Sequence, residues 1–396
     1  MKLIKVLPYF IAIFFLTRAV FSDSFTYDEP LHVQSGIEWL KNGTSVTDPF
    51  NPPLSKLPVV FTTNIHKLRF FSIAYTLGLM SLIFYWSKKF YGVKTAILAS
   101  FLLVMEPTIL AYGHLFTTEI LATLVYFLIF MNPILWPLVI LVKVTLIPML
   151  LPYLNPNKIA GIVALILFFI FRDTIIHAFS FVFNPKFAST HTFMLFENLS
   201  NSGWWYYPLL VLPIKLSPIL LFSLIIGLKD KRSYKLIVPI FFILLTVIVG
   251  RYNTGIRHLL PLFPFLVIIG AIGLSKINVK ILVFILFFNI VYIFKINDYI
   301  AYFNPLIGSD IGGRIAVESN LDIGQSVFRA QTEVDFSKID SFVFNVYGGS
   351  EMPIDISNKN ILVSRTLWYT KNYYKDPRFL NRKTRLIADG TLILVE

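Results

Sequence analysis

Long apolar runs separated by short loops constrain this chain more than any other feature. Of its 396 residues, 56% are hydrophobic and 14% are charged, whereas a soluble domain carries about a quarter charged residues. A run of about 20 apolar residues is long enough to cross a bilayer as a helix. The sequence therefore predicts an α-helical polytopic membrane protein. The runs lie at residues 3–21, 69–86, 95–113, 117–131, 134–154, 157–171, 205–228, 236–250, 258–274 and 280–294.

The basic residues gather in short loops between these runs. The clusters are Lys88, Lys89 and Lys94; Lys229, Lys231, Arg232 and Lys235; and Lys276 and Lys280. Cytoplasmic loops carry such an excess of Lys and Arg, so the net charge of +13 reflects topology and predicts no nucleic-acid partner. Run 3–21 is interpreted as the first transmembrane helix, with its N-terminus in the cytoplasm. The absence of cysteine excludes disulfides and thiolate metal sites.

This topology places loops 22–66, 172–204 and 251–257, and the tail from about residue 295, on the extracytoplasmic side. Ten full crossings would return the tail to the cytoplasm, which conflicts with the basic loops. The basic loops fix the topology on both sides of residues 117–171, so the miscount lies in this region. Prolines interrupt it, and we expect it to contain half-spans or an extra crossing. We therefore expect nine or eleven crossings. The prolines are Pro133, Pro137, Pro148 and Pro152.

The composition of the chain changes near residue 308, where the long apolar runs end and glycines precede a mixed polar stretch. Short alternating or apolar runs at 341–347, 360–364 and 391–395 read as strands. We expect a transmembrane catalytic domain over residues 1–297 and a small extracytoplasmic α/β domain over residues 298–396.

The first outer loop carries adjacent acids, Asp28 and Glu29, directly after the first apolar run. One carboxylate could act as a general base, and the pair could hold a divalent cation. Capping of a helix or a hydrated loop is the alternative. Further polar residues and a rigid turn share the loop and favour a site: His32, Asn51, Pro52, Pro53 and Lys56.

A third acid, Glu119, starts an apolar run on the same predicted face, where capping of a helix N-terminus is the alternative. The basic residues expected to bind a donor phosphate are Arg251, Arg257 and His258 on that face, Lys56 of the first outer loop, and Lys215 inside an apolar run. Arginine suits bidentate binding of phosphate oxygens, whereas snorkelling at helix ends is the alternative for the arginines. An ammonium group within an apolar run needs a partner.

Five blocks in order resemble the protein O-mannosyltransferase-like enzymes, which are GT-C-fold membrane glycosyltransferases related to the aminoarabinose lipid A transferases. The resemblance covers residues 1 to about 325. The blocks are YDEPLHVQSGIEWLKNG with NPPLSKLP (27–43 and 51–58), HLFTTE (114–119), GWWYYPLLVLPIKLSP (203–218), NTGIRHLLPLFPFL (253–266) and YFNPLIGSDIGGRIAVESNLDIGQ (302–325).

The resemblance implies inverting transfer of mannose or a related sugar from a polyprenyl- or dolichyl-phosphate donor to a hydroxyl group of a protein, lipid or glycan on the outer face. It maps catalytic acids onto Asp28, Glu29 and Glu119, with Asp28 as the first choice for the base. A divalent cation, if one binds, would be held by Asp28 and Glu119. Three positions depart from the common pattern: Glu119 replaces Asp, Asn51 replaces His before Pro-Pro, and Ile323 replaces Trp.

Two other functions fit parts of the sequence. A transporter or flippase of a lipid-linked sugar also needs phosphate-binding arginines, but it predicts acids near the midplane on repeat-related broken helices. A structural membrane subunit leaves the acids and bases on one face unexplained. A single cavity containing Asp28, Glu119 and Arg257 would favour the enzyme.

Overall fold

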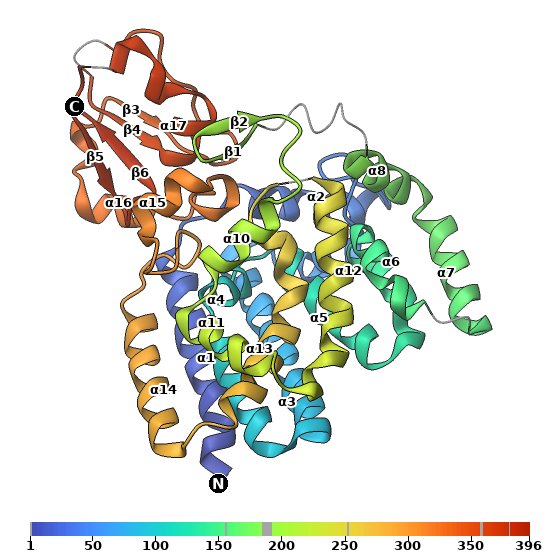
Figure 1. Ribbon diagram of the computed structural model, residues 1–396. Helices are drawn as coiled ribbons and strands as arrows, with labels where there is room; N and C mark the ends of the chain where they lie inside the picture. Colours follow the sequence, from blue (N-terminus) through green and yellow to red (C-terminus); the bar gives the residue numbers. More distant parts are fainter. Residues whose placement is uncertain (1, 155–156, 184–191, 252, 357–358, 380) are drawn as a thin grey trace.

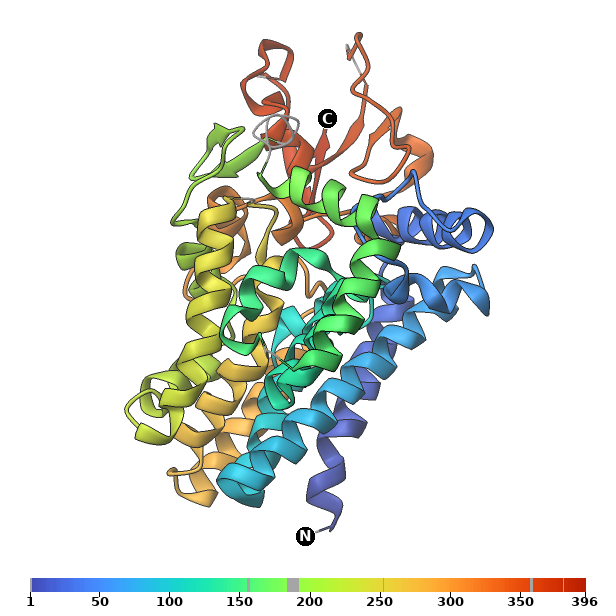
Figure 2. The same cartoon turned by 90° about the vertical axis from the view of Figure 1, so that its right-hand side faces the viewer.

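The computed structural model is a helical bundle with a small sheet region at one end (Figure 1). The structure describes residues 2–154, 157–183, 192–251, 253–356, 359–379 and 381–396. The N-terminus lies at the end of the bundle opposite the sheet region (Figures 1 and 2). This architecture confirms the predicted fold class of a helical membrane protein with a C-terminal α/β region.

Within the described residues, four helices are long and apolar enough to cross a membrane, or six if each of two bent pairs is one span. The predicted nine or eleven crossings exceed this count because four further apolar segments form helices of only 10–17 residues. The main helices of the bundle are α1 (Lys2–Ser22), α3 (Ile65–Val104), α5 (Glu119–Met131), α7 (Lys158–Ile170), α8 (Arg172–Phe183), α10 (Tyr207–Lys215), α11 (Pro218–Gly227), α12 (Tyr234–Gly250), α13 (Phe263–Leu274) and α14 (Val279–Phe294).

Helix α3 contains a non-helical residue, Gly92, with a φ of 86°. Glycine adopts positive φ without the steric cost that other residues meet. The break separates the two apolar runs that the sequence analysis distinguished at 69–86 and 95–113. The buried α13 packs against α3 and α11 at the centre of the bundle.

The region between α5 and α7 is broken, as its prolines predict. Proline removes a helical hydrogen bond and clashes with the preceding turn, so this stretch forms three short pieces in place of a full span. They are η2 (Pro133–Leu138), α6 (Val139–Val142) and η3 (Val144–Tyr153).

The basic loops meet at one end of the bundle. The Lys94 ammonium donates to the carbonyl of Ser275 at 2.6 Å, and the Tyr91 hydroxyl donates to the carbonyl of Arg232 at 3.0 Å. Lys276 forms an ion pair of 3.0 Å with Asp230. The three clusters thus share one face, as the positive-inside pattern requires.

The remaining short elements lie mainly toward the other end (Figure 1). After α1 the chain forms α2 (Asp28–Asn42) and η1 (Pro53–Val60), and α4 (Pro107–Gly113) precedes α5. The predicted outer loop 172–204 contains α8 and a hairpin, β1 (Phe193–Leu195) with β2 (Asn198–Ser200); its residues 184–191 lie outside the described ranges. The other short helices are η4 (Lys231–Ser233) and η5 (Ile256–Leu262).

The C-terminal region contains a four-stranded mixed sheet in the order β3-β4-β6-β5. The strands β3 (Ser341–Val343), β4 (Ile361–Ser364) and β6 (Leu392–Val395) fall in the three predicted runs, whereas β5 (Thr384–Ile387) was not predicted. The short helices of the C-terminal region are α15 (Gly308–Ile315), η6 (Glu318–Asn320), α16 (Val327–Glu333), η7 (Phe336–Lys338), α17 (Arg365–Thr370), η8 (Tyr373–Lys375) and η9 (Pro377–Phe379).

Candidate active site

A polar cavity of about 200 Å³ opens between α2, α5, the broken segment 132–154, α12 and η5. It contains the three residues, Asp28, Glu119 and Arg257, whose convergence would favour an enzyme. Its lining residues are Asp28, His32, Phe50, Asn51, Thr118, Glu119, Lys143, Thr145, Met149, Ala178, Thr246, Val247, Gly250, Arg257 and His258.

The first ion pair of the cavity joins Asp28 to Arg257, 229 residues apart in the chain. Asp28 is the first residue of α2, where a carboxylate interacts favourably with the helix dipole. Arg257 lies in η5 beside His258, whose imidazole Nε2 is hydrogen-bonded to the Thr254 hydroxyl. Both members of the pair are partly accessible from the cavity, so a ligand can reach them.

The second ion pair joins Glu119 to Lys143, with Oε1 and Nζ 3.2 Å apart. Glu119 begins α5, and Lys143 lies between α6 and η3. Lys143 has a non-helical backbone where the prolines break the segment. As a lone lysine inside an apolar run, Lys143 was a candidate for a polar cavity from the sequence, but the unresolved topology around it left it out of the expected site residues.

Glu29 does not face the cavity, although it is the neighbour of Asp28. Its carboxylate accepts two hydrogen bonds of 2.7 Å from Arg69 and one of 3.0 Å from each of the backbone N–H groups of Thr26 and Phe116. Burial acts to raise the pKa of Glu29, but the Arg69 charge and these hydrogen bonds hold the pKa below its usual value. Glu29 therefore joins the start of α2 to Arg69 of α3 and does not line the cavity. This position differs from its expected place among the catalytic acids.

Lys56 also lies outside the cavity lining. Its ammonium is 2.9 Å from the Asp48 carboxylate and donates to the Ser35 hydroxyl at 2.6 Å. The same Asp48 lies 3.4 Å from His32 Nδ1 and accepts from the Asn51 amide at 3.1 Å. Asp48 thus links the buried lysine to His32 and Asn51, which do line the cavity.

The other predicted site residues lie elsewhere. Lys215 is buried, donates to the carbonyls of Ile300 and Asn320 at 2.7 Å, and lies 4.2 Å from the centre of the Phe303 ring. Arg251 is exposed at the C-terminal end of α12 with a left-handed backbone. Pro53 is the first residue of η1 and Pro52 precedes it, and neither lines the polar cavity.

A divalent cation does not fit the residues present. Across the described parts of the chain, no three His, Asp or Glu side chains are close enough together to hold a metal ion. The two carboxylates that the sequence analysis assigned to a metal, Asp28 and Glu119, are each compensated by a cationic side chain.

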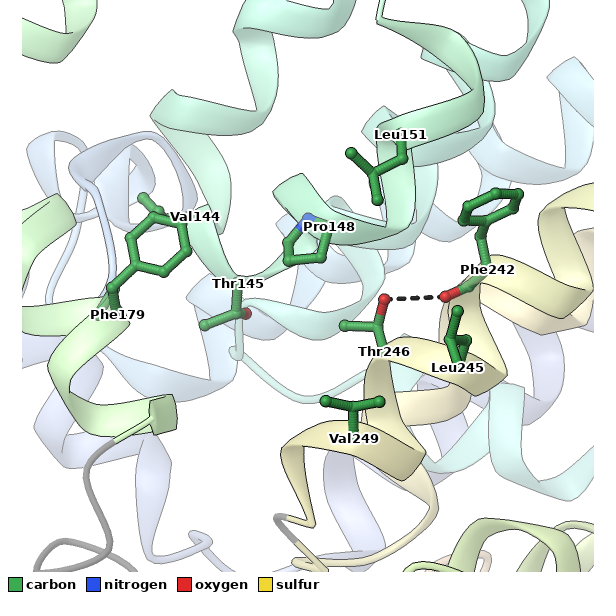
Figure 3. Close-up of a pocket in the computed structure, with 10 residues that line it drawn as sticks. Val144, Thr145, Pro148, Leu151, Phe179, Phe242, Leu245, Thr246 and Val249 are labelled. Carbon is green, nitrogen blue, oxygen red and sulfur yellow. Dashed lines mark hydrogen bonds between the residues drawn. The ribbon is translucent and has the colours of Figure 1, made fainter.

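An apolar groove of about 150 Å³ continues from the polar cavity. Three residues line both spaces: Thr145, Ala178 and Thr246. In Figure 3 the α12 side chains Phe242, Leu245 and Val249 face Val144, Pro148 and Leu151 of η3 across the groove, with Phe179 at one side. The Thr246 hydroxyl donates to the carbonyl of Phe242 at 2.8 Å, which leaves an apolar surface.

Comparisons with known proteins bear on the fold. No family model and no curated protein sequence matches the chain. Two solved structures of ArnT from Cupriavidus metallidurans are similar: one bound to undecaprenyl phosphate, with a TM-score of 0.52 and 14% identity, and one in the apo state, with a TM-score of 0.50 and 15% identity. Each match covers 69% of this chain and 60% of the ArnT chain. The chain therefore has the GT-C fold of ArnT.

Proposed function

We propose that this protein is an integral-membrane glycosyltransferase that moves a sugar from a polyprenyl-phosphate donor to an acceptor hydroxyl. The observation that carries the proposal is the joining of two spaces of different chemistry. A cavity with two cations and two acids continues into an apolar groove through Thr145, Ala178 and Thr246. A lipid phosphate has the matching pair of parts, a charged head and an apolar tail.

In this proposal the donor phosphate binds to Lys143 and Arg257. Both side chains line the cavity, and they come from different elements that converge there. A guanidinium and an ammonium together can neutralise the charge that develops on a leaving phosphate. The first polyprenyl units then lie in the groove between α12 and η3. The undecaprenyl phosphate bound to ArnT in one similar structure supports this class of ligand.

Transfer also needs a carboxylate that takes the proton of the acceptor hydroxyl. Asp28 and Glu119 line the cavity and are the candidates from the sequence analysis, with Asp28 first. The acceptor is a hydroxyl of a protein, lipid or glycan, and the sugar is a hexose, such as mannose, or a related pentose.

We place the reaction on the extracytoplasmic face. Residues of α2 line the cavity, and α2 lies toward the sheet end of the bundle (Figure 1), whereas the basic loops meet at the other end. Soluble nucleotide sugars are cytoplasmic, so a reaction on the outer face needs a donor that the membrane delivers.

The test is transfer of a radiolabelled sugar from a synthetic polyprenyl-phosphate sugar by the purified protein in liposomes. We expect wild type to transfer sugar and Asp28→Asn to lose at least a hundredfold in rate, because the variant removes a cavity carboxylate and the partner of Arg257. Glu351→Gln, at an exposed acid of the C-terminal region, is the control and should retain the rate. Movement of intact donor across the bilayer without transfer would favour a flippase instead.

A further inference from the structure

One wall of the polar cavity comes from the segment between α1 and α3. It consists of His32 of α2 and of Phe50 and Asn51, which lie shortly before η1. We call these three residues the loop wall. None of them lines the apolar groove, which joins the cavity through residues of η3, α8 and α12. Since the proposed donor tail lies in the groove, the loop wall is the side of the cavity available to the acceptor.

His32 is oriented by a buried carboxylate. Its Nδ1 is buried and lies 3.4 Å from an Asp48 oxygen. Burial acts to raise the pKa of Asp48, but His32 and the Lys56 ammonium hold it below its usual value, so Asp48 is an anion. An anion beside Nδ1 favours a proton on that nitrogen. In the neutral ring the lone pair is then on Nε2, and His32 offers the cavity a hydrogen-bond acceptor.

Asn51 offers a second hydrogen-bond acceptor. Its side-chain amide nitrogen donates to both Asp48 oxygens at 3.1 Å. Because a carboxylate only accepts, these bonds fix which end of the amide is the nitrogen. Among the residues that the structure describes, neither the Asn51 side-chain oxygen nor His32 Nε2 has a hydrogen-bond partner. Both groups lie beside the same carboxylate and line the same cavity.

Buried contacts hold Asp48 in place behind the loop wall. Its carboxylate lies 2.9 Å from the Lys56 ammonium, and its backbone N–H donates to the Ser45 hydroxyl at 3.0 Å. The Ser35 hydroxyl of α2 accepts from Lys56 at 2.6 Å and donates to the Ser45 hydroxyl at 2.7 Å. The two acceptor groups are therefore positioned before a ligand binds, which lowers the entropic cost of binding.

Asp28 lies between the loop wall and the proposed phosphate site. On one side it pairs with Arg257. On the other side it precedes His32 by four residues in α2, and residues four apart share one face of a helix, about 5.4 Å apart along its axis. A pyranose ring can span one such turn. A sugar held at His32 and Asn51 can therefore place a further hydroxyl at Asp28.

We propose that the acceptor is a glycan, and that His32 and Asn51 bind two hydroxyl groups of the sugar that receives the new residue. The inference rests on the proposed function and names its acceptor class. One hydroxyl donates to His32 Nε2 and another to the Asn51 side-chain oxygen. The ring lies against Phe50, and the hydroxyl that reacts lies at Asp28.

A sugar fits the loop wall better than the other acceptor classes. A pyranose ring carries several hydroxyl donors in a rigid arrangement, which matches two fixed acceptors. A serine or threonine side chain, or a lipid alcohol, has one hydroxyl and would leave at least one of the two groups without its bond in a closed site, which costs affinity. An aromatic side chain with a few placed polar groups is also typical of a small-molecule site.

The test compares loss of a side chain with loss of a hydroxyl group in a double-mutant cycle. Transfer from the polyprenyl-phosphate sugar in liposomes is measured with methyl glucoside, mannoside and galactoside and their monodeoxy derivatives. His32→Asn keeps an amide near Asp48 and removes the nitrogen that faces the cavity. We expect the KM of the best glycoside to rise about tenfold, with kcat and the donor KM unchanged.

The same rise in KM should appear in wild type with one monodeoxy derivative, and His32→Asn should add nothing to it. Asn51→Ala should show this coupling with a different hydroxyl of the same sugar, so the proposal does not depend on one variant. An unchanged donor KM shows that each variant is folded. His177→Asn, at an exposed histidine of α8, is the matched control and should keep the wild-type KM for every acceptor.

Three results would overturn the glycan assignment. They are independent, additive effects of side chain and hydroxyl; coupling to hydroxyl groups of the donor sugar in place of the acceptor; and wild-type transfer to a serine- or threonine-containing peptide or to a long-chain alcohol but to no glycoside. Failure of the proposed function is distinct, because wild type would then transfer sugar to none of the three acceptor classes.

Discussion

At the scale of single residues, the adjacent acids Asp28 and Glu29 have opposite environments. Successive residues of an α-helix point about 100° apart, so two acids in the first turn of α2 cannot share one surface. Asp28 faces the cavity, whereas Glu29 is buried against Arg69. The sequence predicts an outer loop here, with helix capping as the alternative, and it contains no signal for which acid turns inward.

The Glu29–Arg69 pair should make a large contribution to stability. Removing one partner of a buried ion pair leaves the other charge uncompensated and costs about 3–5 kcal/mol. We therefore expect Glu29→Gln to lower the free energy of unfolding by about that amount at pH 7, measured by thermal unfolding in detergent micelles.

The exposed acid Glu351 supplies the control, and Glu351→Gln should change stability by less than about 0.5 kcal/mol. Because the folded-state pKa of Glu29 is lowered, its contribution is present above the unfolded pKa. It disappears as the pH falls through the folded-state pKa. Equal stability of Glu29→Gln and wild type at pH 7 would contradict this role.

The positions of some other site residues could be predicted from the sequence, and those of others could not. Asp28, Glu119, Arg257 and His258 were predicted on one face, and the structure gathers them in one cavity. Lys215 was predicted to need a partner and has two carbonyl partners, away from the cavity.

At the scale of elements, the proline-broken segment between α5 and α7 shapes the site. An uninterrupted helix there would pair its backbone N–H and C=O groups with one another and pack along α12. The short pieces η2, α6 and η3 instead place Lys143 in the cavity and Val144 and Pro148 in the groove. The prolines predict the break, but the path of the chain after it depends on packing against α8 and α12.

A variant at the junction of cavity and groove tests whether a lipid chain lies there. Ala178 lines both spaces, so Ala178→Phe should fill the passage and weaken binding of a long-chain polyprenyl phosphate at least tenfold. Binding of a phosphate with a two-isoprene chain should weaken less. Val238→Phe, on the exposed surface of α12, should leave both affinities unchanged. Equal weakening by the two variants would exclude a specific passage.

At the scale of the whole molecule, the C-terminal region holds the start of α2 in place. The backbone N–H groups of Ser24 and Tyr27 donate to the carbonyls of Gln325 and Ile323 at 3.0 and 2.8 Å. Arg329 pairs with Asp23, after α1, and with Asp298, after α14. The predicted boundary at residue 298 remains a prediction, but the region beyond it contributes directly to the geometry around Asp28.

Arg329→Met should loosen this connection. Asp23 and Asp298 are buried and would lose their shared cation, so we expect faster hydrogen exchange in residues 23–29 and a lower rate of transfer. Arg385→Met, at an exposed position of β5, should change neither. If exchange in residues 23–29 stays at the wild-type rate, the C-terminal region does not position α2.

The sequence could predict the membrane class, the basic face and three of the strands, because hydropathy, charge and alternation are local signals. It could not predict the contacts between residues 24–27 and 323–325, which join segments about 300 residues apart. Strand β5 was missed because it carries Thr384 and Arg385 on an exposed edge. Long-range pairing of this kind is decided by packing of the whole chain.

The central claim is that the cavity binds the phosphate of a polyprenyl lipid, and the most direct measurement is the affinity for polyprenyl phosphate in detergent. The double variant Lys143→Met/Glu119→Gln removes one buried ion pair without leaving a lone charge. A hydrogen bond to a charged group contributes about 1.5–3 kcal/mol, so we expect the double variant to bind at least tenfold more weakly than wild type. Lys158→Met, an exposed lysine, should bind as wild type does. Wild-type affinity in the double variant would contradict the claim.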